Sequence, residues 1–190
     1  MRRALGLVVV AALMAVSSVA LAGEPYASYL DRWNEVSYSG NDGSLKWGSA
    51  WSEFGDDNRP ESGILHVYTD SYCADYKCLH IEGKGDGVTF GVKRFADLSV
   101  FQEADICFEL TGYVDEELSD GQLLVQVTTD GSSWKTVASY ELAALGGYFH
   151  PQIDLTDFRT KSFGVKFAVV GVFYGELFLD TVELKGLLGS

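Results

Sequence analysis

Hydrophobic and polar residues alternate along much of the chain at a period of two, which is typical of half-buried β-strands. The segment 163–169, for example, places Phe163, Val165 and Phe167 on one face and Lys166 on the other. The same pattern occurs at residues 63–69, 78–82, 88–93, 104–110 and 123–128. After the N-terminal apolar run, only the short stretch 141–145 has the composition of a helical turn. The pattern predicts an all-β protein.

Turn-forming residues separate these segments. Glycine, aspartate and asparagine gather between the alternating runs, where they favour tight turns, at residues 41–43, 56–60, 83–87, 119–121 and 130–131. Many short strands with one apolar face, joined by such turns, are typical of an antiparallel β-sandwich. The sequence has no internal repeat and no proline-rich linker, so we expect one domain.

The N-terminus has the pattern of a secretory signal peptide. Two arginines precede a short apolar run, and small residues end in Ala20-Leu21-Ala22, a pattern that favours cleavage before Gly23. The alternative is an uncleaved membrane anchor, but the apolar run is short for a bilayer span. We therefore expect residues 1–22 to be removed. Residues 23–190 then form one soluble domain, secreted to the periplasm or the extracellular space, with no membrane insertion after cleavage.

The charge balance narrows the choice of partners. The chain has 14 Lys and Arg residues against 27 Asp and Glu residues, for a formal net charge of -13. A negative field of this size repels nucleic acids and anionic lipid surfaces. We therefore expect neither of them as a partner.

Three cysteines lie in the expected secreted domain. Cys73 and Cys78 flank a short polar loop, and export would allow a disulfide between them. The alternative is a pair of free thiols near the tip of a hairpin. Cys107 lies inside the strand predicted at 104–110, where a buried thiol is expected. The spacing of the cysteines and of the three histidines does not match a zinc site.

Seven segments in order resemble bacterial secreted jelly-roll modules of the MAM-like and galactose-binding-like kind. They are residues 29–33, 45–53, 95–110, 121–134, 153–156, 165–167 and 176–183, and 121–134 is the closest match. The resemblance implies an antiparallel jelly-roll β-sandwich that is not an enzyme and that binds a carbohydrate or a cell-surface partner. The sequence departs from the pattern at Asp180-Thr181, where these modules often have two acids, and in the insertion containing Cys73 and Cys78.

Asp180 is the acid that most needs an explanation, because it lies between Leu179 and Val182 in a predicted strand. A carboxylate at such a position is costly unless other groups satisfy it. The resemblance implies a structural calcium ion between the first and last strands, with Asp31 as the second ligand, and calcium prefers oxygen ligands. The alternative is an Asp180 carboxylate that accepts backbone hydrogen bonds or faces solvent.

Catalytic patterns are weak. Glu103, Asp105 and Glu109 share one face of a predicted strand, but Cys107 interrupts that face and the spacing does not fit the paired acids of glycoside hydrolases. We expect a solvated outer face there.

The histidines offer no clear catalytic set either. The sequence has no G-x-S-x-G motif to accompany His66, His80 or His150. If the strands beside the Cys73–Cys78 loop pair, His66 is expected opposite Glu82 and Tyr68 opposite His80, as ordinary cross-strand neighbours. A site formed by these pairs is the less favoured alternative.

Aromatic residues make up 13% of the chain, enough for both a core and a binding surface. Trp51 and Trp134 match recurrent positions of the resemblance and are expected in core or turn packing. Four other rings lie in polar or loop-like surroundings and are the candidates to stack on a sugar: Trp47, Tyr72, Tyr76 and Tyr113. The sequence thus favours a secreted, non-catalytic module that binds a glycan or a cell-surface partner. A structural or adhesive protein without a small ligand is the alternative, and an exported hydrolase is the weakest of the three.

Overall fold

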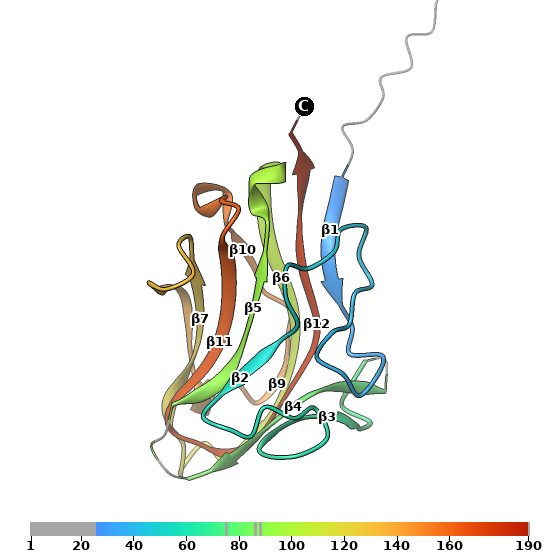
Figure 1. Ribbon diagram of the computed structural model, residues 1–190. Helices are drawn as coiled ribbons and strands as arrows, with labels where there is room; N and C mark the ends of the chain where they lie inside the picture. Colours follow the sequence, from blue (N-terminus) through green and yellow to red (C-terminus); the bar gives the residue numbers. More distant parts are fainter. Residues whose placement is uncertain (1–25, 75, 86, 88, 190) are drawn as a thin grey trace, which may run out of the picture.

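The computed structural model describes residues 26–74, 76–85, 87 and 89–189 (Figure 1). The predicted signal peptide at 1–22 lies outside them. Twelve strands of the described chain form two antiparallel sheets that face each other, which confirms the predicted β-sandwich. None of the helical segments in this part of the chain is long and apolar enough to cross a membrane.

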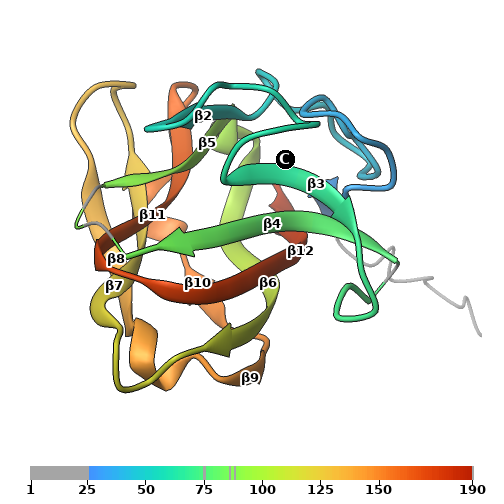
Figure 2. The same ribbon diagram turned by 90° about the horizontal axis from the view of Figure 1, so that it is seen from below.

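Sheet A has seven strands, which are β1 (Tyr26–Asp31), β3 (Leu65–Thr69), β4 (Lys77–Lys84), β6 (Phe101–Val114), β9 (Gly147–Phe149), β10 (Gln152–Asp154) and β12 (Tyr174–Leu188). Its order is β10-β6-β12-β4-β3, with β1 added to β12 and β9 added to β6. Figure 2 shows β3, β4 and β12 side by side. The first part of β12 pairs with β4, and its second part pairs with β1.

Sheet B has five strands, which are β2 (Ser52–Phe54), β5 (Phe90–Ala96), β7 (Asp120–Thr128), β8 (Lys135–Glu141) and β11 (Phe163–Val172), in the order β2-β5-β11-β7-β8. Three short 3-10 segments complete the described chain: η1 (Leu98–Val100), η2 (Leu142–Ala144) and η3 (Thr156–Phe158). The helical turn expected at 141–145 is therefore confirmed as η2. The Asp130 carboxylate accepts hydrogen bonds from the backbone N–H groups of Ser132 and Ser133, which shapes the turn between β7 and β8.

The core lies between the sheets and consists of the apolar residues at alternate positions. On sheet A, Leu79 and Leu110 flank Leu179 of β12; all three side chains are buried. On sheet B, Phe167 lies between Val92 and Val125 in the same way. The alternating pattern of the sequence thus becomes two facing apolar layers, because neighbouring residues of a strand point to opposite faces.

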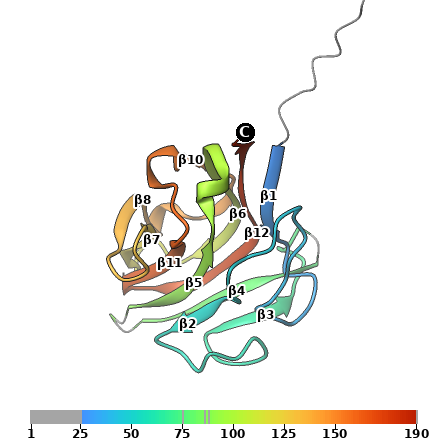
Figure 3. The same cartoon turned by 45° about the horizontal axis from the view of Figure 1, so that its top comes forward.

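The connection from β1 to β2 is long and irregular, and it runs along the side of the sandwich next to β1 (blue to teal in Figure 3). It is held to the core by Arg94 of β5, whose guanidinium donates to the backbone carbonyls of Ser49 and Gly40 at 2.8 Å each. The same guanidinium lies 4.5 Å from the ring centre of Trp47. One buried cation therefore fixes a loop that has no regular secondary structure.

Candidate functional site

A row of side chains crosses the outer face of sheet A. The strand register places His66 of β3, His80 of β4, Phe178 of β12, Thr111 of β6 and Tyr148 of β9 directly opposite one another in turn. Cross-strand partners point to the same face of a sheet. Because sequence neighbours such as Leu65, Leu79 and Leu179 lie in the core, the side chains of this row point away from it.

Aromatic rings cover this row. The Phe178 ring stacks on His80, with 5.0 Å between ring centres, and the Tyr72 ring contacts Phe178 at a tilt, with 5.4 Å between ring centres. Phe178 itself is buried, whereas four tyrosines around it are at least half exposed: Tyr68 (50%), Tyr72 (52%), Tyr113 (70%) and Tyr148 (61%). We call these four side chains, with Phe178 beneath them, the tyrosine face.

A hollow of about 270 Å³ opens in the tyrosine face. It is lined by Ser71, Tyr72, Cys73, Ala74, Glu109, Thr111, Tyr148 and Asp180. One wall is the loop that begins after β3, and the other walls come from β6, β9 and β12. The hollow is slightly smaller than the range of about 300 to 1,000 Å³ that holds drug-sized ligands, so it suits a group the size of a single sugar ring.

The loop wall is held in two ways. Cys73 and Cys78 form a disulfide, which confirms the predicted pairing, and this bond packs against Phe178. The backbone N–H of Ala74 donates to the carboxylate of Asp180. Asp180 is therefore a buried acid with a backbone hydrogen bond, one of the two alternatives that the sequence left open for it.

Carboxylates make the tyrosine face acidic. Glu109 and Asp180 line the hollow, and Glu82 and Glu176 lie opposite each other in the neighbouring row. Partial burial, the charge of Glu109 and a hydrogen bond from the Tyr148 phenol to Glu109 raise the pKa of Tyr148, so this phenol stays a protonated donor at neutral pH. The face therefore offers several acceptors, at least one donor and flat rings, but no cation among these residues.

His80 is a buried titratable group in the row, between His66 and Phe178. Burial lowers its pKa below the usual value of 6.5, and the neighbouring His66 lowers it further, although Glu176, Glu82 and Asp70 act in the opposite direction. The Nδ1 atom of His80 lies 3.3 Å from the Nε2 atom of His66. At neutral pH the imidazole of His80 is therefore uncharged.

This lowered pKa predicts a loss of stability in mild acid. As the pH falls through about 6.5, the unfolded chain takes up a proton at His80 before the folded chain does. The free energy of unfolding therefore decreases from about pH 6.5 down to the folded pKa of His80. We expect the melting temperature to decrease more between pH 7.5 and 5.5 in the wild type than in His80→Gln. Equal decreases in the two proteins would contradict this assignment.

The structure separates the four aromatic residues that the sequence proposed for sugar contact. Tyr72 and Tyr113 belong to the tyrosine face, and Tyr76 is 77% exposed on the disulfide loop. Trp47 is a correction, because only 9% of it is exposed and its ring packs against Tyr29 and the Arg94 guanidinium. Its polar sequence neighbours gave no indication of the cation that covers it.

The two acids expected to share a calcium ion do not meet. Asp31 points between the sheets, where its carboxylate forms an ion pair with Arg94 and accepts a hydrogen bond from the indole N–H of Trp51 at 3.0 Å. Asp180 lines the hollow on the outer face of sheet A. Both acids are buried, but on opposite sides of the sheet, so one ion cannot bind both in this arrangement. Whether calcium binds stays a prediction of the sequence.

Within the described residues, one other group of acids has ligand atoms close together. Oxygen atoms of Glu53, Asp56 and Asp57 lie within 4.8 Å of one another. Each acid already accepts hydrogen bonds inside the protein: Glu53 from Tyr38 and the backbone of Asn58, Asp56 from the backbone of Leu65, and Asp57 from that of Arg59. These bonds account for the clustering, since they shape the turn between β2 and β3.

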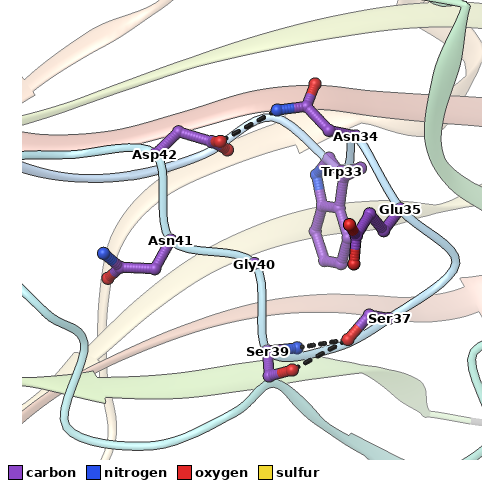
Figure 4. A pocket seen from close by; sticks show the side chains of 8 residues that line it. All are labelled: Trp33, Asn34, Glu35, Ser37, Ser39, Gly40, Asn41 and Asp42. Atoms are coloured by element: carbon purple, nitrogen blue, oxygen red, sulfur yellow. Dashed lines mark hydrogen bonds between the residues drawn. The ribbon is translucent and has the colours of Figure 1, made fainter.

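A second hollow, of about 410 Å³, lies inside the β1–β2 loop (Figure 4). Trp33 forms one side of it, and Asp42 and Asn41 lie across from the ring. The Asp42 carboxylate accepts hydrogen bonds from the backbone of Arg32 at 2.9 Å and from the Asn34 side chain at 2.8 Å. The acidic wall of this hollow therefore holds the loop in shape.

Sequence reasoning missed Tyr68, Tyr148, Phe178 and Thr111 as parts of the candidate site. It also placed the β3–β4 register two residues away from the observed one, in which His66 faces His80 and Tyr68 faces Cys78. The only sequence signal for these residues was the alternation along the strand. Phe178 and Asp180 are two residues apart on one strand, so they are expected on the same face of the sheet. The expected buried thiol at Cys107 and the buried Trp51 are confirmed.

The two facing antiparallel sheets form a jelly-roll β-sandwich whose fold is similar to that of carbohydrate-binding modules and adhesin domains, which confirms the resemblance at the level of the fold. No family model matches the sequence, and no curated protein matches it. The relationship therefore rests on three-dimensional similarity to solved structures.

Three solved structures illustrate this similarity. The K3 cleaved adhesin domain of Lys-gingipain from Porphyromonas gingivalis is 12% identical with a TM-score of 0.58, covering 85% of this chain and 99% of that domain. TmCBM61 in complex with β-1,4-galactotriose is 15% identical with a TM-score of 0.52, covering 71% and 88%. The CBM22-1 xylan-binding domain of Xyn10C from Paenibacillus barcinonensis is 12% identical with a TM-score of 0.51, covering 86% and 94%.

Proposed function

We propose that this protein is a secreted, non-catalytic module that binds an uncharged polysaccharide along the tyrosine face. The observation that carries the proposal is the tyrosine face, with its four half-exposed tyrosines around a hollow that two carboxylates line. Large apolar side chains are exposed together here, and such patches mark binding sites on soluble proteins.

The chemistry of the face favours a sugar. Flat rings can stack on the apolar face of a pyranose, while a few polar groups fix its orientation, as in other ligand sites. Glu109, Thr111 and Asp180 offer acceptors for sugar hydroxyl groups inside the hollow. Because Glu82 and Glu176 add negative charge nearby, an acidic polysaccharide would be repelled. An uncharged chain fits better, such as the β-1,4-galactotriose in the TmCBM61 complex or the xylan bound by the CBM22-1 domain.

Secretion is part of the proposal. Disulfides form and persist in oxidising compartments, and the Cys73–Cys78 bond is built into the wall of the hollow. The N-terminal signal pattern points the same way.

Binding can be measured directly by isothermal titration with xylohexaose and β-1,4-galactotriose, after a glycan array has selected the best sugar. We expect Tyr148→Ala and Tyr72→Ala each to weaken binding at least tenfold, since the loss of an anchoring ring costs about 2 kcal/mol or more and tenfold corresponds to about 1.4 kcal/mol. Tyr26→Ala is the matched control. Tyr26 is 73% exposed but pairs with Leu187, nine residues along β12 from Phe178 and thus roughly 30 Å away.

Two outcomes would overturn parts of this proposal. No signal for any uncharged glycan would reject the binding function and favour the alternative of an adhesive module that recognises a cell-surface protein. New reducing ends in the glycan after incubation would reject the non-catalytic assignment. In that case Glu109 and Asp180, which line the same hollow, would be the acids to replace.

A further inference from the structure

The outer face of sheet B combines aromatic rings with positive charge, whereas the tyrosine face combines them with negative charge. Three aromatic side chains, Phe54, Phe95 and Trp134, are partly exposed there. Two of these rings lie against glycines of the sheet. A Cβ atom on Gly91 would come within 2.9 Å of the Phe54 ring, and one on Gly164 within 2.7 Å of the Phe95 ring. Glycine at both positions therefore lets the rings lie close to the sheet.

Two lysines lie among these rings. Lys93 of β5 and Lys166 of β11 are direct cross-strand partners on the outer face. The ammonium of Lys166 lies 4.6 Å from the ring centre of Trp134 and 5.5 Å from that of Phe54. The ring contacts are favourable, but two like charges directly opposite each other are destabilising.

The protein does not neutralise this pair. None of the ion pairs among the described residues involves Lys93 or Lys166, although acids outnumber basic residues 27 to 14 in the chain. Partial burial and the charge of Lys93 together lower the pKa of Lys166. Glu141 of β8, at the far edge of the sheet, accepts a hydrogen bond from the Gln122 side chain and forms no ion pair with either lysine. Two neighbouring cations with no acid partner, in a strongly acidic protein, suggest that an anion from outside supplies the missing charge.

We propose that this lysine–aromatic face, formed by Phe54, Lys93, Phe95, Trp134 and Lys166, is a second binding site, for a sugar that has a carboxylate. A pyranose ring would stack on Trp134 while its carboxylate lies over the two ammonium groups. The net charge of -13 repels a polymer with a carboxylate on every residue. The site therefore fits a largely uncharged glycan with isolated uronic acid groups. This inference does not depend on binding at the tyrosine face.

The test compares two ligands that differ only in charge. The first is a neutral oligosaccharide with one glucuronic acid group, and the second is the same oligosaccharide with that carboxyl group reduced to the alcohol. Isothermal titration of the full protein should give at least tenfold weaker binding for the reduced ligand. Lys166→Gln should remove this difference, and Lys93→Gln should reduce it. The preference should also weaken between 50 mM and 300 mM NaCl, as expected for surface charges.

Matched controls keep the two sites apart. Tyr148→Ala should leave the preference for the acidic ligand unchanged, whatever it does to uncharged glycans. Equal affinity of the wild type for both ligands would overturn the inference, as would an acid preference that survives in both lysine variants. Lys93→Gln serves as the second variant because Lys93 makes neither of the ring contacts recorded for Lys166, so its loss disturbs the fold less.

Discussion

Replacing Arg94 with Met should lower the free energy of unfolding by about 3 to 5 kcal/mol, the usual cost of removing one partner from a buried ion pair. The Asp31 carboxylate is fully buried and would lose its counter-charge. The same change removes the hydrogen bonds to Ser49 and Gly40 that hold the β1–β2 loop. Urea unfolding at pH 7, followed by circular dichroism, measures the loss.

The pH dependence of the Arg94→Met variant should show whether the unpaired Asp31 carboxylate causes its loss of stability. Burial already raises the pKa of Asp31 and lowers that of Arg94 to about 10, even though each group favours the charged form of the other. Without Arg94, the folded-state pKa of Asp31 rises further above its unfolded value. The variant is then penalised as the pH rises through that folded pKa, so its deficit should be larger at pH 7 than at pH 4.5.

A double variant separates the charge from the packing. Asp31→Asn keeps an oxygen that can accept the hydrogen bond from the Trp33 backbone, made at 2.9 Å in the wild type. Combined with Arg94→Met, it should be more stable than Arg94→Met alone, since no unpaired charge remains buried. A single Arg94→Met variant within 1 kcal/mol of the wild type would contradict the assigned role of the pair.

Removing the disulfide should affect both stability and binding. In the double variant Cys73→Ser/Cys78→Ser, the unfolded chain is no longer constrained by a short cross-link, which costs about 2 kcal/mol for a loop of this size. The loop also supplies Ser71, Tyr72 and Ala74 to the wall of the hollow. We therefore expect the affinity for an uncharged glycan to decrease at least tenfold, measured by isothermal titration.

Cys107→Ser is the control for this experiment. Cys107 is also buried but is not part of the disulfide, so its replacement should leave glycan affinity unchanged. If the double variant bound the glycan as tightly as the wild type, the hollow beside the disulfide loop would not be the binding site. The disulfide would then contribute to the stability of the fold but not to glycan affinity.

The sequence predicted the strands well because their signal is local. Alternation at Leu65 and Val67, or at Phe163, Val165 and Phe167, depends only on which face of a strand is buried. The turn at Asp130-Gly131 and the single turn of η2 were also found, since their residue types have local conformational preferences. Strand register depends on pairing between distant segments. The β3–β4 register was therefore predicted two residues away from its real position.

The candidate site was predicted only in part, for the same reason. Tyr72 and Tyr113 were identified because polar neighbours mark exposed positions. Trp47 has similar neighbours, but Arg94, 47 residues later in the chain, covers its ring. Asp31 was assigned to calcium because the resemblance placed the first and last strands together. No local pattern indicated that an arginine from the other sheet would reach the Asp31 carboxylate.

By itself, the sequence determined the fold class, the acidic charge and the cysteine pair, because each follows from composition or from patterns within a few residues. Only the tertiary structure decided which rings share a face, which acids are paired and where the two lysines meet. Seven strands from distant parts of the chain form sheet A. The chemistry of its outer face is therefore set by register and by the packing of loops, which no local pattern records.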